Sequence, residues 1–274
     1  MPLSRLGVCS WSLRPSDPAD LVDQVLATGL KAVQLALSPV VSEREAWGSA
    51  IGKLMSHNVQ LLSGMIAPVG EDYSTIDRIR ETGGIRVDAH WPANEAMIRA
   101  AAVVAKNAGM GLITFHAGFL PHDAADPERA VMVGRLQSIA DICGRESVRV
   151  GLETGQEDAS TLLAVLSEID RPNLGVNFDP ANMVLYGTGD PIEAFEQLAP
   201  HVVQLHIKDA TPPSELGQWG TEMPVGEGVV DWDRFMAIAA SLEHDVDATI
   251  EREAGEDRAG DIRMAVDAIG EHLP

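Results

Sequence analysis

Three carboxylates and one imidazole stand at the ends of short apolar runs, where they could hold a divalent metal ion: Glu153, Asp179, His206 and Glu251. These runs are typical of buried β-strands and cover residues 148–153, 174–179, 202–207 and 247–251. Converging carboxylates repel one another strongly unless a cation lies between them. Oxygen-rich ligands with one nitrogen favour an octahedral ion over a tetrahedral structural zinc. We therefore expect one bound divalent ion, with Mn²⁺ as the first choice and Mg²⁺, Co²⁺ or Zn²⁺ as alternatives.

Each of these side chains, taken alone, has a simpler explanation. A single Glu or Asp at a strand end is more often a loop cap or a salt-bridge partner. A single histidine such as His206 is more often a hydrogen-bonded core residue. The repetition of the pattern on four successive strands is what favours a metal site.

Side chains alternate across a strand, so each run should have one apolar face for the helices and one face for the site. In the run at 202–207, the face expected to meet the helices consists of Val203, Leu205 and Ile207. The opposite face carries Val202, Gln204, His206 and Lys208. The other three runs divide in the same way, and in each of them the second face ends in a carboxylate.

Four more side chains are candidates for contact with a substrate, each with a structural alternative. Lys208 shares the face of His206, and a solvated surface lysine is the alternative. His116 ends a run at 112–116 and could contact substrate or lie in the core. Trp11, expected at the end of the first strand, could form an apolar wall for a sugar ring or simply pack. His90 could line the pocket, although packing of its loop is the more usual role.

The elements that must position these residues alternate regularly between strand and helix. The expected strands cover residues 7–11, 31–36, 59–65, 112–116, 148–153, 174–179, 202–207 and 247–251. The expected helices cover residues 17–29, 43–57, 94–108, 127–143, 160–169, 191–198, 231–242 and 257–269. This alternation predicts an α/β fold, a (β/α)₈ TIM barrel with a single domain over residues 1–274. Its active site should lie at the carboxyl ends of the strands.

An open doubly wound sheet is the alternative fold. It is less favoured because no glycine-rich phosphate-binding fingerprint follows the first strand. Residues 67–92 form a long irregular stretch, which in a compact domain is usually a lid, a binding loop or a set of small extra elements. A second loop, polar and rich in Pro and Gly, covers residues 211–228.

The composition narrows the classes of function. The chain of 274 residues is 45% hydrophobic, enough to bury a sizeable core, and carries a formal net charge of −21. An acidic protein repels a phosphate backbone, so we expect no nucleic acid partner. Cys9 and Cys143 form no paired spacing that would suggest a disulfide framework or a cysteine metal site. Neither a secretory signal nor a run of membrane-spanning length is visible, so we expect a cytoplasmic protein without membrane contact.

Five segments carry a resemblance to a known family. They are Gly151-Leu-Glu153-Thr-Gly155, Asn177-Phe-Asp179-Pro-Ala-Asn-Met183, Gln204-Leu-His206-Ile-Lys-Asp209, Pro224-Val-Gly-Glu-Gly228 with Asp231-Trp232, and Thr249-Ile-Glu251. Through them nearly the whole chain resembles the xylose isomerase-like barrel superfamily. This sugar phosphate isomerase/epimerase group includes the ketose 3-epimerases, inosose dehydratase and the apurinic endonuclease IV type.

The resemblance implies roles for the same residues. By it, the shared metal ligands are matched by Glu153, Asp179, His206 and Glu251. In the ketose epimerase branch, the positions of Glu153 and Glu251 also act as the acid/base pair. The resemblance further suggests that the protein forms dimers or tetramers.

The sequence departs from two branches of this group at Asn182. The nuclease branch has a histidine three residues after the strand-end aspartate, where this chain has Asn182, and another near residues 65–68, where it has none. A nuclease is therefore not expected. The ketose 3-epimerases usually carry a substrate-contacting histidine at the same place. Asn182 is thus a candidate substrate residue, and the general chemistry is expected without the familiar epimerase substrates.

The expected function is that of a divalent-metal-dependent sugar isomerase or epimerase, with a ketose or keto-sugar derivative as its small-molecule substrate. The ion would polarise the carbonyl and stabilise an enediolate, while Glu153 and Glu251 move protons on opposite faces. If the enediolate instead expels a β-hydroxyl, the same site is a dehydratase or lyase acting on a keto-sugar or inosose. A non-catalytic sugar-binding barrel is the third reading, and the intact set of four ligands argues against it.

Overall fold

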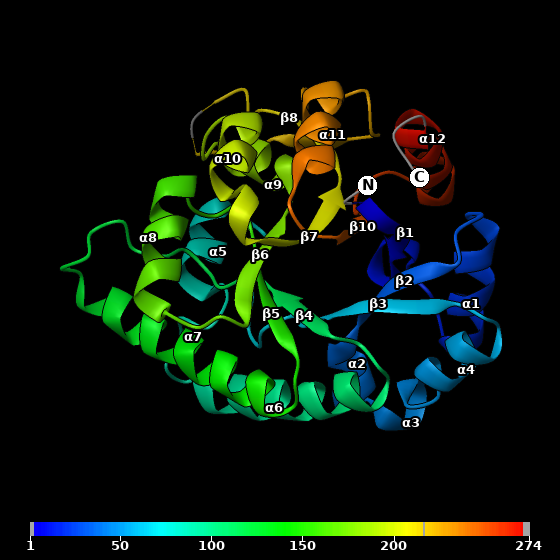
Figure 1. Ribbon diagram of the computed structural model, residues 1–274, viewed down its shortest axis with the longest axis horizontal. Coiled ribbons are helices and arrows are strands. Elements are labelled where there is room, and N and C mark those ends of the chain that lie inside the picture. Colours follow the sequence, from blue (N-terminus) through cyan, green and yellow to red (C-terminus); the bar gives the residue numbers. More distant parts are fainter. Residues whose placement is uncertain (1–2, 216, 271–274) are drawn as a thin grey trace.

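Parallel strands close into a barrel at the centre of the molecule, and helices cover its outside (Figure 1). The structure, a computed structural model, describes residues 3–215 and 217–270. Around the barrel the order is β1 (Leu3–Cys9), β10 (Val246–Ile250), β7 (Val202–Ile207), β6 (Leu174–Phe178), β5 (Arg149–Glu153), β4 (Leu112–Phe115), β3 (Gln60–Met65) and β2 (Ala32–Ala36). Each strand pairs in parallel with both neighbours. The predicted (β/α)₈ TIM barrel is thus confirmed.

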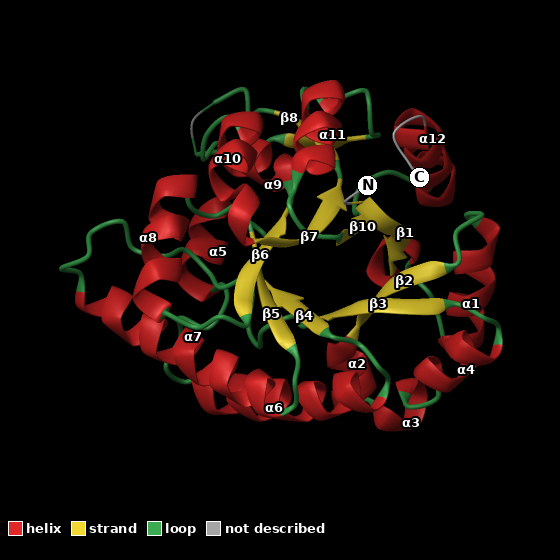
Figure 2. Cartoon of the chain, in the orientation of Figure 1, coloured by secondary structure: helices red, strands yellow, loops and turns green. Residues whose placement is uncertain are grey.

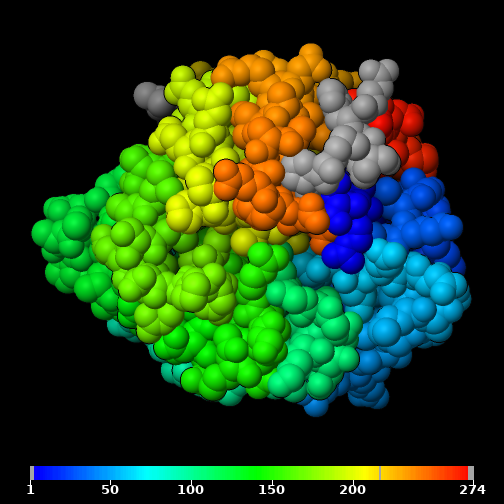
Figure 3. All heavy atoms as spheres, viewed as in Figure 1, coloured from blue at the N-terminus to red at the C-terminus, as the bar shows by residue number. Residues whose placement is uncertain are grey.

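The barrel is closed by strands from opposite ends of the chain, and its interior is packed. β1 and β10 lie side by side, with Gly7 paired to Thr249 (Figure 1). The opening between the ribbons in Figure 1 is filled by atoms in the space-filling view (Figure 3). Inside, Gln34 Nε2 donates to Thr114 Oγ1 at 2.8 Å, and Thr249 Oγ1 donates to Gln34 Oε1 at 3.0 Å. This buried polar network forms a rigid base for side chains at the strand ends.

Aspartate caps begin many of the outer helices, shown in red in Figure 2. Backbone N–H groups of the first turn donate to Asp17, Asp126, Asp158, Asp179, Asp190, Asp231 and Asp257. The α-helices are α1 (Pro18–Ala27), α2 (Leu37–Ser42), α3 (Arg44–Trp47), α4 (Ala50–Ser56), α5 (Ile76–Thr82), α6 (Trp91–Asn107), α7 (Pro127–Arg145), α8 (Ala159–Ile169), α9 (Pro180–Tyr186), α10 (Pro191–Leu198), α11 (Trp232–Ser241) and α12 (Arg258–Ile269). The 3₁₀-helices are η1 (Ser10–Leu13) and η2 (Ala199–His201). Within the described residues, no helix is both long and apolar enough to cross a membrane.

The connections between the main elements differ most from the sequence prediction. The first strand ends at Cys9, so Trp11 lies in η1 rather than on a strand. The helix expected over residues 43–57 is divided into α3 and α4, and α2 precedes it as a separate short helix. The stretch 67–92 contains α5. The loop 211–228 contains β9 (Thr221–Met223), which pairs with β8 (Asp209–Thr211). Elements this short contain too few turns or alternations for a sequence pattern to indicate them.

α9 has no counterpart in the sequence prediction. It has seven residues and begins directly after β6, with Pro180 in its first turn. The prediction continues the strand to Asp179, whereas the structure makes this residue the cap of α9. No loop separates β6 from α9, so Asp179 could belong to the end of the strand or to the start of the helix. The alternation of apolar residues does not distinguish these two positions.

A β-bulge in β7 changes the face on which Val203 lies. β6 pairs with Val202 and with Gln204, so Val203 is an extra residue between two paired ones. A Cβ atom added to Gly151 or Gly175 would meet the side chain of Val203. Val203 therefore points into the barrel, and the prediction that it faces the helices is wrong.

The same bulge also moves the residue before it. Val202, predicted on the site face, belongs to the hydrophobic core. Beyond the bulge the predicted alternation is confirmed, since Leu205 and Ile207 are core residues, while His206 contacts Gln34 of the interior. An insertion of one residue shifts every earlier side chain of a strand to the other face.

Three phenylalanines fix the end of β6. Phe178, its last residue, stacks on Phe195 of α10 with ring centroids 4.6 Å apart, and Phe195 lies 4.8 Å from Phe235 of α11. All three side chains are fully buried. Because Asp179 follows Phe178 directly, this close packing also fixes the carboxylate that caps α9.

Gly84 lies where the segment before α6 passes the segment after β4. Its φ of +67° is in the left-handed region, and a Cβ atom there would overlap the backbone of Ala117 and Gly118. We expect Gly84→Ala to lower the free energy of unfolding by about 3 kcal/mol, because backbone strain and steric overlap add. Urea unfolding measures this change.

Gly52→Ala is the control for this substitution. Gly52 lies in α4, and nothing lies within 4 Å of a Cβ atom added there. Alanine should stabilise the helix at this position by about 0.5–1 kcal/mol. If the two variants changed the free energy of unfolding equally, the close approach at Gly84 would not matter for stability.

Candidate metal centre

The four residues predicted as metal ligands meet at the carboxyl ends of neighbouring barrel strands. Glu153 is the last residue of β5, Asp179 follows β6, His206 lies in β7 and Glu251 follows β10. All four are buried, and one ligand atom from each lies within 4.8 Å of those of the others. This metal cluster, as we call the four residues, could hold one metal ion.

The imidazole of His206 faces the carboxylates through Nδ1. Its distances to the nearest carboxylate oxygens are 3.4 Å to Glu153, 3.5 Å to Asp179 and 3.3 Å to Glu251. Within residues 3–215 and 217–270, Nδ1 of His206 and Oδ2 of Asp179 are buried without a hydrogen-bond partner. Two ligand atoms held at about 2.1 Å and at right angles around one ion lie about 3 Å apart, close to these separations. The set of donors therefore fits a divalent ion.

The other ring nitrogen of His206 is held from the barrel interior. Nε2 lies 2.7 Å from Oε1 of Gln34, an oxygen that can only accept, so Nε2 carries the hydrogen. The amide nitrogen of Asn177 is farther from Nε2, at 3.1 Å, and donates to Glu153 at 3.2 Å. Nδ1, which faces the carboxylates, is therefore the nitrogen that would give up its proton and bind an ion.

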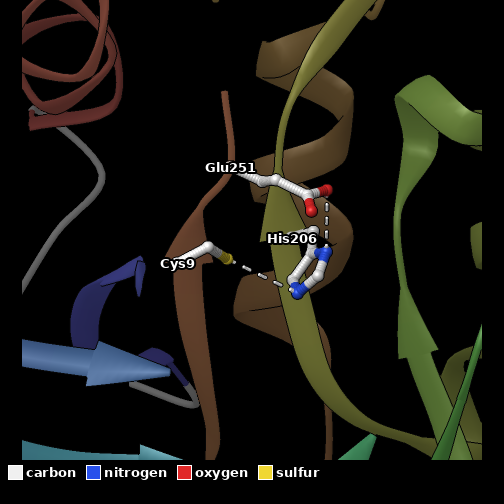
Figure 4. Close-up of side chains that lie close together, drawn as sticks. All are labelled: Cys9, His206 and Glu251. Carbon is white, nitrogen blue, oxygen red and sulfur yellow. Dashed lines mark hydrogen bonds and ion pairs between the residues drawn. The ribbon is translucent and has the colours of Figure 1, made fainter. Parts of the chain in front are cut away.

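Cys9 lies on the Nε2 side of the His206 imidazole, whereas Glu251 lies on the Nδ1 side (Figure 4). Its Sγ is 3.9 Å from Nε2 of His206, whereas Glu251 contacts the opposite ring nitrogen. Burial raises the pKa of Cys9 to about 12, so its sulfur stays a neutral thiol. Cys9, His206 and Glu251 lie close enough to form a group of three ligands. However, Sγ lies beside the ring nitrogen that Gln34 holds. One ion cannot bind both ring nitrogens, so Cys9 is a packing neighbour of His206 with respect to the metal cluster.

Donors from other elements hold the carboxylates in place. Nδ2 of Asn182 donates to Glu153 at 2.9 Å, and Nε1 of Trp11 donates to Glu251 at 2.6 Å. The backbone N–H of Asn182 donates to Asp179 at 2.9 Å. Trp11 and Asn182, both predicted to contact substrate, thus also orient members of the metal cluster.

Burial and opposite charges act against each other on the acidic groups. Burial alone would raise the pKa of Glu153, but the neighbouring imidazoles outweigh it and the pKa is lowered. Burial is also outweighed at Glu251, where the ammonium of Lys208 holds the pKa well below its usual range. At Asp179 burial prevails and raises the pKa to about 6. A bound divalent cation would keep all three carboxylates ionised.

Lys208 is buried beside the metal cluster instead of lying in solvent. Its Nζ donates to Glu251 at 2.9 Å, to Glu253 at 2.8 Å and to Asn182 at 3.2 Å. Burial opposes the charge, but these carboxylates prevail and raise the pKa of Lys208 well above its ordinary value. The side chain is therefore a fixed positive charge in the wall of the site.

We expect Lys208→Met to lower the free energy of unfolding of the metal-free protein by about 3 kcal/mol at pH 7, because Glu251 would stay buried without its cation. Lys106→Met is the matched control. Lys106 forms a pair with Glu146 at 2.7 Å, but its side chain is 53% exposed, and the loss should stay below about 1 kcal/mol. Urea unfolding compares the two variants, and equal losses would contradict the prediction.

The pH dependence of this effect follows from the directions of the shifts. The lowered pKa of Glu251 stabilises the fold above its unfolded value of about 4.3, and this is lost as pH falls through the folded value. The raised pKa of Lys208 stabilises the fold below its unfolded value of about 10.4, and this is lost as pH rises through the folded value. The difference in free energy of unfolding between wild type and Lys208→Met should therefore be largest between about pH 4.3 and 10.4. It should become smaller below and above this range.

A cavity of about 510 Å³ adjoins the metal cluster. Four of the residues predicted to contact substrate line it: Trp11, His116, Asn182 and Lys208. Nε2 of His116 lies 3.3 Å from Oε1 of Glu153, so this histidine links the cavity to the cluster. The volume is in the range of pockets that hold small ligands.

The fifth predicted substrate residue, His90, lies elsewhere. It precedes α6 and does not belong to the lining of the cavity. Its ring packs so closely on Gly70 that a Cβ atom there would overlap the imidazole. The structure therefore gives His90 the alternative role of packing its loop.

Among the lining residues that the sequence prediction did not name are Glu71, Tyr73, Tyr186 and Trp219. Two of them come from the stretch 67–92, one ends α9 and one lies in the loop 211–228. The sequence indicates a candidate binding loop at 67–92 and a polar loop at 211–228. Which of their side chains turn toward the strand ends depends on the path of each loop, and no local pattern records that path.

The comparisons with known proteins agree with this architecture. A family model described as xylose isomerase-like TIM barrel matches residues 22–271. The crystal structure of a xylose isomerase domain protein from Planctomyces limnophilus has a TM-score of 0.85 and 31% sequence identity to this chain. The match covers 92% of this chain and 91% of that one.

Two further matches carry different activities in their names. The 3-dehydroshikimate dehydratase of Bacillus anthracis is 26% identical over 138 residues, which is 44% of this chain and 49% of that protein. The chain thus spans about half the length of this curated relative. The D-allulose 3-epimerase of Methylomonas sp. has a TM-score of 0.74 at 16% identity, covering 100% of this chain and 99% of that one, which shows a shared fold alone.

Proposed function

Because the chain belongs to the xylose isomerase-like TIM barrel family, we propose that it is a metal-dependent enzyme that isomerises or epimerises a ketose or keto-sugar. The observation that carries the proposal is the position of two glutamates in one cluster. Glu153 ends β5 and Glu251 follows β10, with β6 and β7 between them in the barrel. One carboxylate can therefore take a proton from one face of a carbon atom while the other returns a proton to the opposite face.

A divalent ion held by the metal cluster would polarise the carbonyl of the substrate and favour loss of the neighbouring proton. The chain's own groups prepare the two glutamates for this work. Their pKa values are lowered, so both are ionised at neutral pH and can accept a proton. Trp11 and Asn182 fix their orientation, and His116 gives Glu153 a route for exchanging its proton with the cavity.

The test is exchange of substrate hydrogen with solvent deuterium. The protein is reconstituted with Mn²⁺ and, in parallel, with Mg²⁺ and Co²⁺, and a panel of ketoses and keto-glycosides is followed by nuclear magnetic resonance. Isomerisation or epimerisation should place deuterium on the carbon next to the carbonyl, in a product that otherwise has the formula of the substrate. Absence of exchange in every sugar, with an ion bound to each chain, would reject the proposal.

A dehydratase or lyase is the second candidate. The similarity to a 3-dehydroshikimate dehydratase supports it, and so does Glu71. Its carboxyl group lines the cavity, where it could exchange a proton with a leaving hydroxyl group. Elimination would give an unsaturated product that absorbs ultraviolet light. Ultraviolet spectra of the same reaction mixtures would detect it.

A further inference from the structure

We propose that the cavity selects an uncharged keto-sugar that carries an apolar substituent. The sugar would lie at the metal cluster and the substituent against Tyr186 and Trp219. This inference rests on the proposed function and names the class of substrate for the same site. Three features of the cavity carry it: the pairing of its lysine, the excess of acidic groups and the aromatic part of its wall.

Lys208 is the one lysine or arginine among the described residues that line the cavity. An ammonium group has three N–H donors, and Lys208 has three partners in Glu251, Glu253 and Asn182. No donor is left over for the phosphate or carboxylate of a ligand. The side chain that could have bound an anion is used within the protein.

Acidic groups outnumber cations around the cavity. Glu71, Glu251 and Glu253 line the cavity, and Glu153 and Asp179 belong to the adjoining metal cluster, which makes five carboxyl groups in all. One divalent ion would supply two positive charges and Lys208 a third. A phosphate or carboxylate on a ligand would therefore meet net repulsion in a partly buried site, where charges are poorly screened.

The arginines of the adjoining hollow are also engaged. This hollow shares Tyr186 with the cavity and contains Arg80 and Arg86. Both terminal oxygens of Glu128 pair with Arg86, at 2.5 and 2.7 Å. Arg80 lies 4.9 Å from the ring centroid of Phe119. Arg80 also pairs with Asp77. Because both arginines are paired with carboxylates, neither guanidinium group is left free to bind an anionic ligand.

Aromatic side chains form another part of the cavity wall. Tyr186, the last residue of α9, packs against Trp219 with ring centroids 4.8 Å apart. Trp219 comes from the loop between β8 and β9 and stays partly exposed. A flat apolar group can pack on such a surface without a polar partner, whereas the hydroxyl groups of a sugar need the polar groups at the cluster.

Binding of three inert glucosides to the Mn²⁺-loaded protein tests the proposal without turnover. The probes are methyl β-D-glucoside, phenyl β-D-glucoside and phenyl β-D-glucuronide, which differ in one apolar group or in one carboxylate. Calorimetry gives their dissociation constants. We expect the phenyl glucoside to bind at least about tenfold more tightly than the methyl glucoside. The phenyl glucuronide should bind at least about tenfold more weakly than the phenyl glucoside.

Substitutions assign these differences to residues. Trp219→Ala should remove most of the advantage of phenyl over methyl, whereas Trp219→Phe should keep most of it. Glu71→Gln should reduce the penalty on the glucuronide by about threefold. Glu81→Gln, which removes the same charge from an exposed position of α5, should leave the penalty unchanged. Thermal unfolding of each variant ensures that loss of the fold is not taken for loss of binding.

Two results would overturn the proposal. A phenyl glucoside that binds no more tightly than the methyl glucoside, or does not bind, removes the apolar subsite. A glucuronide that binds as tightly as the phenyl glucoside removes the preference for an uncharged ligand. Because no turnover is measured, a lack of deuterium exchange in the ketose panel would reject the proposed function and leave this binding result intact.

Discussion

Glu251→Gln is expected to lower the rate of deuterium exchange into the substrate by at least about 10³-fold while the protein keeps its fold. Glutamine preserves the length of the side chain and can still accept the hydrogen bond from Trp11. It cannot take up a proton, and it carries no charge to balance Lys208. Metal content, measured on the same samples, separates loss of the acid/base group from loss of the ion, since three ligands remain.

Glu253→Gln is the matched control for this variant. Glu253 also pairs with Lys208, at 2.8 Å, and lines the same cavity. However, its side chain is 52% exposed, and it is not a member of the metal cluster. Its exchange rate should stay within about tenfold of the wild-type rate. Full activity of Glu251→Gln, or equal losses in both variants, would remove Glu251 from the acid/base pair.

Asp179→Asn is expected to weaken Mn²⁺ binding by at least about 100-fold. Asparagine caps helices as well as aspartate does, so α9 should keep its start. The substitution removes a negative charge and replaces one oxygen of the cluster by an amide group, which cannot bind a metal ion through its nitrogen. Titration with Mn²⁺, followed by electron paramagnetic resonance, gives the affinity directly.

Asp190→Asn controls for the effect of changing a helix cap. Asp190 caps α10 by accepting from the N–H groups of Ile192 and Glu193, and it is not part of the metal cluster. Its Mn²⁺ affinity should equal that of the wild type. An Asp179→Asn variant that still holds one tightly bound ion per chain would show that the four residues do not form the site.

The metal cluster could be found in the sequence because its signal is local. Glu153, Asp179 and Glu251 each close a run of five or six residues in which apolar side chains alternate, and His206 lies within such a run. A parallel barrel brings the carboxyl ends of all its strands to one side, so residues at equivalent ends must meet. The same alternation of strand and helix predicts the fold class, and the closed strand order confirms it.

Local patterns do not record a change of one residue in register. The alternation of β7 predicts Val203 on the outer face, but the bulge turns it into the barrel. The sequence pattern also does not indicate α9, because this helix has only seven residues and begins where β6 ends. In both cases pairing with another part of the chain, and not local preference, fixes the position of a residue.

Only the tertiary structure decides which other residues complete the site. Trp11 donates to Glu251 across 240 positions of sequence, and this contact exists because β1 and β10 close the barrel. Lys208 could be a solvated lysine by its sequence, and its burial follows from two carboxylates that come from the end of β10. Trp219 reaches the cavity through the path of a loop. Periodicity fixes the direction of a side chain from its own strand, whereas these contacts depend on where distant segments of the chain pass.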